Sequence, residues 1–226
     1  MSDPLLSESI QNYLKVIYKL EKNLEEASTS DIAKELNISS ASVTGMLKRL
    51  SAMRLVNYNS YKGVTLTKDG KALALEVIRH HRLIEVYLRQ SLGYKLAKIH
   101  DEACKLEHYV SKDFIDKITE ILDDPEFDPC GHPIPTKDGA MPAKDESSLI
   151  DFEPIITATI SSLNDENVEL LNYLDDVGLL PGKKITLLEK SPYYGPIRLT
   201  FDDKEISIGH EVAKMIFIDK KSIKHT

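Results

Sequence analysis

The chain has 226 residues, of which 42% are hydrophobic and 29% charged, with a formal net charge of −7 and two cysteines. This composition is typical of a soluble protein, and the length predicts more than one domain. It excludes a membrane-spanning protein, because no apolar run approaches the ~20 residues that cross a bilayer. Two cysteines and an amino terminus without signal-peptide character exclude a disulfide-stabilised secreted fold, so we expect a cytoplasmic protein.

Charge is distributed unevenly along the chain. Residues 29–71 contain seven Lys or Arg and three Asp or Glu, a net charge of +4, which leaves −11 on the remainder. A small basic module attached to an acidic body is typical of a protein that binds nucleic acid through one domain. A solvated surface with a chance excess of lysine would give the same count, so charge alone does not decide.

The amino-terminal third has the pattern of a winged helix. Residues 5–21, 30–36 and 40–50 show the apolar spacing of three helices, the last two separated by a short turn. Residues 55–58 and 63–66 alternate as two strands around a polar turn. Three helices followed by a hairpin predict a helix-turn-helix with a wing.

The third helix and the wing carry the side chains expected to meet DNA. Small hydroxyls fit close to phosphates or base edges, and basic groups neutralise phosphates. The alternative is that these helices only pack as a structural module. The candidate residues are Ser39, Ser40, Ser42, Thr44, Lys48, Arg49, Tyr61 and Lys62.

The run HDEACKLEH carries the first group of candidate metal ligands. At ~100° per residue, its His100, Cys104, Glu107 and His108 share one arc of a helix, beside an apolar face that includes Leu106. Buried polar groups of this kind need compensation, which a divalent cation would supply. Imidazole, thiolate and carboxylate together favour a first-row transition metal over Ca²⁺ or Mg²⁺.

Two further patterns contribute candidate ligands. His81 and Glu85 stand one helical turn apart inside an apolar stripe, and Cys130 and His132 flank a glycine in a proline-rich stretch. The alternatives are a satisfied core histidine with a carboxylate partner, and an ordinary turn with a buried cysteine.

The remaining segments complete the organisation. Thr67 is expected to cap a long helix, residues 72–122 read as mostly helical and suited to packing in a dimer, and residues 123–150 read as a connection. Beyond it, five short strand patterns surround one helix and predict a small β-barrel. The strands are expected at residues 155–160, 184–189, 197–201, 205–208 and 215–218, and the helix at residues 166–176.

With these motifs in this order, the chain resembles the metal-dependent transcriptional repressors of the diphtheria toxin repressor and manganese transport regulator family. The resemblance covers nearly the whole chain and is most specific at His81, Glu85 and HDEACKLEH. It implies a mainly α fold with small β content, in three domains. These are a winged helix-turn-helix DNA-binding domain at 1–72, a helical metal-binding and dimerisation domain with a proline-rich connection at 73–145, and an SH3-like (FeoA-like) domain at 146–226.

The resemblance implies two metal sites per subunit. One uses Cys104, Glu107 and His108, completed from the first helix at Asn12, where family members usually have Met or Asp; Glu8, one turn earlier, is a substitute. In one branch of the family the second site draws on His81, Glu85 and His100. In the other it draws on Glu85, Cys130, His132 and an acidic residue near Asp165, and the Cys-Gly-His motif favours this arrangement.

The implied function is metal-dependent repression of metal homeostasis genes by a homodimer on double-stranded palindromic operator DNA. The effector is Fe²⁺ or Mn²⁺, with a thiolate in each site favouring Fe²⁺, and Zn²⁺, Co²⁺ or Ni²⁺ are expected to substitute in vitro. We expect neither membrane association nor an organic cofactor. Without an HExxH or nucleophile motif we expect no enzyme, so the alternatives are a winged-helix regulator of an organic ligand with structural metal and, less favoured, a metal-dependent hydrolase.

Overall fold

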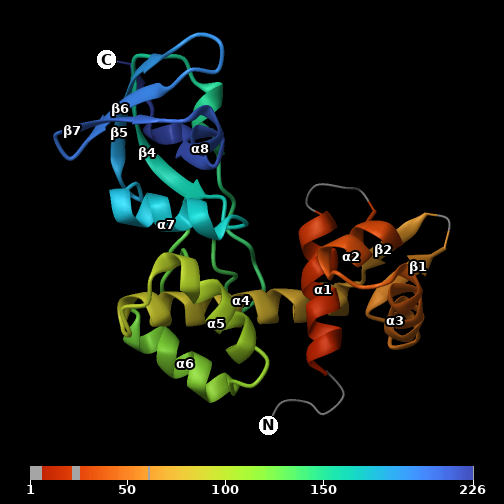
Figure 1. The fold of residues 1–226 in the computed structure, drawn as a ribbon. Helices are drawn as coiled ribbons and strands as arrows, with labels where there is room; N and C mark the ends of the chain where they lie inside the picture. Colours follow the sequence, from red (N-terminus) through yellow and green to blue (C-terminus); the bar gives the residue numbers. More distant parts are fainter. Residues whose placement is uncertain (1–6, 22–25, 61, 226) are drawn as a thin grey trace. The chain divides into compact units, whose positions relative to one another are not determined.

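The computed structural model describes residues 7–21, 26–60 and 62–225, which form two compact units. The first unit comprises Met1–Ile84, Cys104–Ile121 and Pro135–Met141. The second unit comprises Glu85–Ala103, Leu122–Ile134 and Pro142–Thr226. Figure 1 labels most of the helices and strands of both units. Among the described residues, none of the helices has the length and apolar character that crossing a membrane requires.

Three helices open the first unit, at the places that the sequence predicts. They are α1 (Glu8–Glu21), α2 (Thr29–Glu35) and α3 (Ser40–Ala52). Ser28 begins α2 with a capping box, since its hydroxyl accepts from the amide of Asp31 while the Asp31 carboxylate accepts from the amide of Ser28. Ser39 begins α3 by accepting from the amide of Ser42. Local capping therefore fixes where both helices of the helix-turn-helix start.

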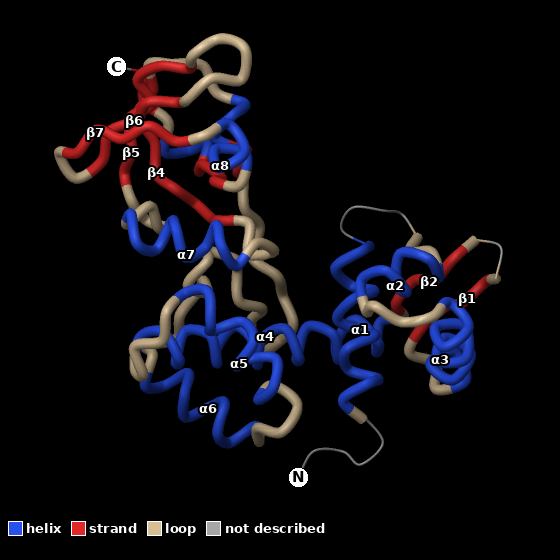
Figure 2. The backbone as a smooth tube through the Cα atoms, viewed as in Figure 1, coloured by secondary structure: helices blue, strands red, loops and turns tan. Residues whose placement is uncertain are grey.

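The wing is an antiparallel hairpin of β1 (Val56–Asn59) and β2 (Gly63–Leu66), drawn in red beside α3 in Figure 2. Ala27 extends it through an antiparallel bridge to Val64. The carboxylate of Glu21, at the end of α1, accepts a 2.6 Å hydrogen bond from the amide of Leu66. The first helix is thereby tied directly to the wing.

One hydrophobic core joins these helices, the hairpin and the start of α4 (Lys68–Gln90). Thr67 caps α4 as predicted, accepting from the amide of Gly70. Gly70 lies so close to the chain that a Cβ there would stand 1.9 Å from the carbonyl oxygen of Leu55, so a larger residue would separate helix and hairpin. The fully buried members of the core include Ile10, Leu14, Ile17, Ile32, Leu47 and Leu50.

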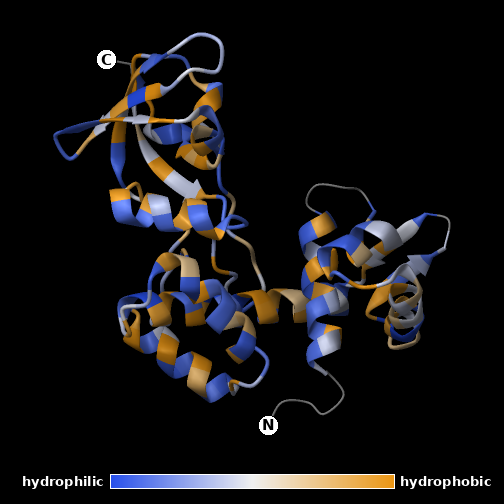
Figure 3. Cartoon of the chain, in the orientation of Figure 1, coloured by the Kyte–Doolittle hydropathy of each residue, from blue (hydrophilic) through white to orange (hydrophobic). Residues whose placement is uncertain are grey.

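The central helices are α4, α5 (Leu96–Leu106) and α6 (Lys112–Ile121). Their side chains divide into buried and exposed faces, and Figure 3 shows hydrophobic and hydrophilic residues alternating along α6. The expectation that one helix carries HDEACKLEH through His108 is wrong, because α5 ends at Leu106 and a turn follows. Leu106 is also 41% exposed, so it does not belong to the buried face on which Ile99 and Ala103 lie.

A curved β-sheet dominates the second unit. Its strand order is β3-β8-β4-β5-β6-β7, with β9 also paired to β4, and these neighbouring strands pair antiparallel. The predicted small β domain is confirmed, while β3, β9 and the short α8 were not foreseen. The elements are β3 (Glu146–Ser148), β4 (Ile156–Leu163), α7 (Val168–Val177), β5 (Lys184–Lys190), β6 (Ile197–Phe201), β7 (Lys204–Ile208), α8 (His210–Lys214), β8 (Ile216–Asp219) and β9 (Lys224–His225).

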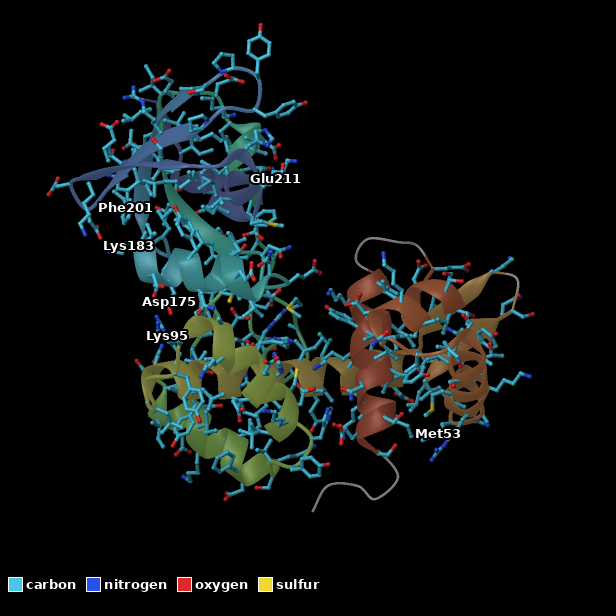
Figure 4. All side chains as sticks on the ribbon, in the orientation of Figure 1. Met53, Lys95, Asp175, Lys183, Phe201 and Glu211 are labelled. Atoms are coloured by element: carbon cyan, nitrogen blue, oxygen red, sulfur yellow. The ribbon has the colours of Figure 1, made fainter. Side chains whose placement is uncertain are left out.

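Helix α7 anchors this sheet domain to the ends of α4 and α5 that belong to the same unit. Asp175 receives two hydrogen bonds from the Arg89 guanidinium, at 3.1 and 2.5 Å, and one from the amide of Leu96. Figure 4 labels Lys95 and Asp175 on the two sides of this contact. A bidentate Arg–carboxylate pair is both directional and strong, so Asp175 sets the position of α7 at this end of the unit.

Candidate metal centres

The first unit gathers His81, Cys104, Glu107 and His108 into one cluster, although the last two lie beyond the helix. His81 belongs to α4 and Cys104 to α5, while Glu107 and His108 occupy the turn after α5. The Sγ of Cys104 stands 4.0 Å from Nδ1 of His81, which is 2.5 Å from the Glu107 carboxylate. A sulfur and a carboxylate thus both lie beside the same imidazole.

Glu107 is the most deeply buried charged group of the cluster, with 1% exposure. Its Oε1 is 2.5 Å from Nζ of Lys15 and 3.1 Å from Nε2 of His108, and its Oε2 contacts His81. Burial alone would raise the pKa of Glu107, but the hydrogen bonds from His108 and His81 and the charge of Lys15 outweigh it, so this pKa lies well below its usual range. Glu107 is therefore ionised, which is the form that a cation would bind.

Helix α1 supplies polar partners for His108. The Nε2 of His108 lies 3.0 Å from Oδ1 of Asn12, the position expected from the first helix. The Nδ1 of His108 lies 2.6 Å from Oε1 of Gln11. Gln11 was not foreseen, because a glutamine beside Asn12 carries no signal of its own in the sequence. Glu8, the expected substitute for Asn12, accepts a 2.9 Å hydrogen bond from the hydroxyl of Tyr109.

The Cys-Gly-His motif forms a tight turn in the second unit. Oδ1 of Asp128 accepts hydrogen bonds of 2.9 Å from the amides of Cys130 and His132, and its Oδ2 is 3.2 Å from Nδ1 of His132. Asp128 was not among the predicted residues. An aspartate two residues before such a motif is the signal that could have identified it, since Asp side chains often accept from amides that follow them.

Asp165 and Glu85 are further candidate ligands of the second unit. Asp165 lies 3.8 Å from the His132 ring, and Glu85 contacts Nδ1 of His100 at 3.3 Å. Burial raises the pKa of the Cys130 thiol, and the negative charges of Asp128, Glu85 and Asp165 raise it further. Three carboxylates therefore lie near enough to the Cys130 thiol for their charges to act on it, and Glu85, one of them, belongs to both predicted ligand sets for the second site.

The turn that contains Cys130 and His132 packs against strand β4 of the sheet. Gly131 has a φ of 85°, and a Cβ there would lie 2.2 Å from the carbonyl oxygen of Ser161. The amide of Leu163 donates to the carbonyl of Cys130 at 2.9 Å, and Nζ of Lys144 donates to the carbonyls of Gly131 and Ser161. Cys130 and His132 are therefore carried by strand β4 and its neighbours.

The donors of both clusters fit a first-row divalent ion. Each cluster combines a cysteine sulfur, imidazole nitrogens and carboxylate oxygens, which are the ligand types that Fe²⁺, Mn²⁺ and Zn²⁺ accept. In the first unit an ammonium group already lies on the buried carboxylate, and in the second the carboxylates around Cys130 leave an excess of negative charge that a cation would neutralise.

The expected DNA-facing residues divide into two groups. The hydroxyls of Ser39 and Thr44 serve α3 itself, because Ser39 caps it and Thr44 donates to the carbonyl of Ser40 at 2.9 Å. Tyr61 lies outside the described residues. The remaining side chains are exposed, and they are Ser40, Ser42, Lys48, Arg49 and Lys62.

Comparison with known families accounts for nearly all of these features. The iron dependent repressor N-terminal DNA binding domain matches residues 5–64, and the iron dependent repressor metal binding and dimerisation domain matches residues 67–136. The FeoA domain matches residues 148–220. The order of the three domains is the one that the sequence predicts.

Similar proteins extend the match over the full length. IdeR, the iron-dependent repressor of Mycobacterium tuberculosis, is 27% identical over 95% of this chain and 98% of its own. A manganese-dependent transcriptional repressor in complex with manganese is 30% identical, covers 93% of this chain and 99% of its own, and superimposes with a TM-score of 0.82. ScaR with bound Cd²⁺ is 33% identical with the same coverage and a TM-score of 0.75. The chain belongs to the diphtheria toxin repressor family of metal-dependent DNA-binding repressors.

Membership of this family confirms the expectation of a transcriptional repressor rather than an enzyme. It also shows that the chain binds divalent metal and carries DNA-binding and dimerisation domains. Most candidate ligands fall inside the matched metal-binding domain, whereas Asn12 lies in the matched DNA-binding domain and Asp165 in the FeoA domain. As a family repressor, the chain therefore draws its candidate ligands from all three domains.

Proposed function

We propose that this repressor responds to Fe²⁺, binds two ions per subunit and acts as a homodimer on palindromic operator DNA to control metal homeostasis genes. The observation that carries this proposal is that each unit contains one cysteine with histidine nitrogens and carboxylates near it. A cysteine-containing donor set in each unit supports two ions, and a sulfur in each favours Fe²⁺ over the harder Mn²⁺.

The first ion is assigned to Cys104, Glu107 and His108, with the Asn12 amide oxygen as the ligand from α1. His81 stays next to this set through its hydrogen bond to Glu107. When bound, the ion supplies a positive charge that holds sulfur, nitrogen and oxygen donors around one point. The uncharged amide of Asn12 adds no further negative charge, so this site relies on Glu107 and the Cys104 thiolate to neutralise the ion.

The second ion is assigned to Glu85, Cys130, His132 and Asp165. Asp128 orients the turn, and by accepting from Nδ1 of His132 it would leave Nε2 as the ligand nitrogen. His100, which contacts Glu85, is the alternative ligand of the other branch. Because burial and the surrounding charges keep the Cys130 thiol protonated, binding at this site should release a proton.

Coupling to DNA runs through α1, whose two ends contact different parts of the first unit. Near its start, Gln11 and Asn12 hold His108, and at its end Glu21 holds the amide of Leu66 in the wing. Ordering of the turn that contains Glu107 and His108 therefore constrains the helix to which the wing is attached. A state that binds metal more tightly and DNA more tightly is the basis of allosteric activation.

Exposed apolar side chains support the homodimer. The segment that contains α6 exposes Leu106, Tyr109, Phe114 and Ile121, with exposed fractions between 41% and 76%. Large apolar groups gathered on one segment are typical of a surface that another subunit covers. Two subunits would present two α3 helices to a palindromic operator with half-sites about one DNA turn, ~34 Å, apart.

The metal preference is tested by replacing Cys104 with a hard oxygen ligand. Operator binding by the metal-free protein is titrated with Fe²⁺ and with Mn²⁺ under anaerobic conditions, and the ratio of the activating concentrations is compared between wild type and Cys104→Glu. Because oxygen favours Mn²⁺ relative to sulfur, the ratio should shift towards Mn²⁺ by about tenfold. Cys104→Ser is the matched control, since it removes the sulfur without adding a carboxylate.

Two outcomes would contradict the proposal. An unchanged ratio for Cys104→Glu would show that Cys104 does not determine the preference for Fe²⁺. Operator binding that no divalent ion alters would instead favour a regulator that responds to an organic ligand and contains structural metal.

A further inference from the structure

Lys15 contacts the first unit's cluster although a lysine is not a usual metal ligand. It lies on α1 one turn after Asn12, and its Nζ approaches Oε1 of Glu107 to 2.5 Å. The Lys15 side chain is 23% exposed, whereas that of Glu107 is 0% exposed. A lysine ammonium is always a donor and never a ligand at neutral pH, so it competes with a metal ion for the same oxygen.

Lys15 and the two histidines leave Glu107 fully engaged. Oε1 faces Lys15 and Nε2 of His108, and Oε2 faces Nδ1 of His81 at 2.5 Å. A buried carboxylate without a counter-charge is strongly destabilising, and Lys15 supplies Glu107 with a full positive charge that does not depend on a histidine proton. The Lys15 ammonium thus supplies the positive charge that a metal ion at Glu107 would otherwise supply.

We propose that Lys15 is a resident counter-ion that a divalent cation must displace from Glu107, so that this lysine sets the metal concentration at which the repressor responds. This inference rests on the proposed function, because it assumes that Glu107 is a ligand. Positive charge close to the site opposes a divalent ion, and breaking the Lys15–Glu107 pair subtracts from the free energy of metal binding. The partial exposure of Lys15 and its long stem allow the ammonium to move into solvent after displacement.

Lys19 provides a matched control on the same helix. It lies one turn after Lys15 and carries the same charge, but its Nζ pairs with Glu35 at 2.7 Å on an exposed surface. Removing Lys19 changes the net charge of α1 by the same amount without touching Glu107. A difference in metal affinity between the Lys15 and Lys19 variants therefore reports the direct contact with Glu107 and not the change in net charge of the helix.

The experiment measures Co²⁺ affinity at the cluster by optical titration of the thiolate-to-Co²⁺ absorption band. All proteins carry Cys130→Ser, so that the band reports Cys104 alone. Lys15→Gln should bind Co²⁺ about tenfold more tightly than the parent, because a repulsive charge and a competing partner are removed. Lys19→Gln should stay within about twofold of the parent, since exposed charges are screened by salt. Lys15→Arg, which keeps the charge, should not bind more tightly than the parent.

A second readout tests the other half of the inference. Without metal, Lys15→Gln should melt at a lower temperature than Lys19→Gln, because only the first leaves a buried carboxylate without its ammonium. With saturating Co²⁺ this difference should shrink, since the ion replaces Lys15.

The outcomes separate the inference from the proposed function. If the parent shows no thiolate band, the assignment of Cys104 and Glu107 as ligands is wrong and the inference falls with it. If the parent shows the band but Lys15→Gln binds Co²⁺ no more tightly than Lys19→Gln, the metal site stands and the inference is overturned. Weaker binding by Lys15→Gln would show that Lys15 orients Glu107 towards the ion and does not compete with it.

Discussion

Glu107 shows how one side chain connects several parts of the first unit. It contacts α1 through Lys15, α4 through His81 and its own turn through His108. The sequence identified Glu107 as a candidate ligand because it lies among histidines and a cysteine. It could not identify Lys15, because a lysine on an amphipathic helix usually lies in solvent. The pairing follows from the packing of α1 beside the turn, which no local pattern encodes.

Lys48 and Arg49 carry the prediction for DNA contact. Both are exposed near the end of α3, within the matched DNA-binding domain. Replacing both with alanine should weaken operator binding, and the slope of log affinity against log salt should fall by up to ~2, because each lost phosphate contact releases about one counter-ion fewer. Fluorescence anisotropy over a salt series measures both quantities.

A charge-matched variant controls for the loss of two positive charges. Lys184 and Lys204 are exposed in the second unit, on β5 and β7, outside the matched DNA-binding domain. Replacing both with alanine removes the same net charge and should leave the salt slope unchanged. If the Lys48→Ala, Arg49→Ala double variant has the same salt slope as wild type, these two residues do not contact the operator.

At the scale of elements, the sequence predicted which helices and strands form better than where they end. Amphipathic spacing identified the helices of the winged domain, and alternation identified the main strands of the sheet. The prediction of where α5 ends was wrong, because the periodic pattern of HDEACKLEH continues past Leu106, whereas the backbone turns there. Glu107 and His108 do lie near Cys104 and His81, as the helical spacing predicted. They reach that position from the turn, however, and not from the face of a helix.

The turn from Asp128 to His132 was the least predictable element of the site. The sequence offered Cys130 and His132 as ligands but gave no indication that Asp128 would accept from both of their amides. Nor did it show that Gly131 would touch strand β4, a contact between segments 30 residues apart in the chain. Long-range packing of this kind depends on the folded sheet.

Replacing Gly131 with alanine tests the role of this turn. The residue has a φ of 85°, and its Cβ would stand 2.2 Å from the carbonyl oxygen of Ser161, so the turn must move away from β4. A displaced turn no longer holds Cys130 and His132, and affinity at the second unit's site should fall about 10- to 100-fold. Calorimetric titration with Mn²⁺ should then show one tight ion per subunit where wild type shows two.

Gly209→Ala is the control for this substitution. Gly209 has an ordinary φ of −70°, and a Cβ there would meet nothing within 4 Å. It should bind two ions as wild type does. Two tight ions in the Gly131→Ala protein would show that the turn does not supply ligands.

At the scale of the whole molecule, the order of the three modules was predictable because each has its own pattern. A basic helix-turn-helix, a helical segment with ligand motifs and a run of short strands follow one another in the sequence, and the three family matches confirm that order. The domain bounds at 1–72, 73–145 and 146–226 stay predictions. The contact-based units divide α4 and α5, so the helices that carry the ligands contribute to both.

At the same scale, we propose that metal ligation and operator binding are one linked equilibrium. Helix α1 provides the physical connection, with Asn12 at the cluster and Glu21 at the wing. Linkage then requires that metal saturation tighten operator binding by the same factor by which operator raises the overall metal binding constant, taken over all the ions of the dimer.

The direct test is a pair of anaerobic titrations on the wild-type protein. Operator affinity is measured with chelated and with Fe²⁺-saturated protein, and Fe²⁺ affinity is measured with and without saturating operator. The linked equilibrium predicts one factor, between about fivefold and 150-fold, both for the rise in operator affinity on Fe²⁺ saturation and for the rise in the overall Fe²⁺ binding constant of the dimer on operator saturation. Operator affinity that is the same in chelated and Fe²⁺-saturated protein would contradict it.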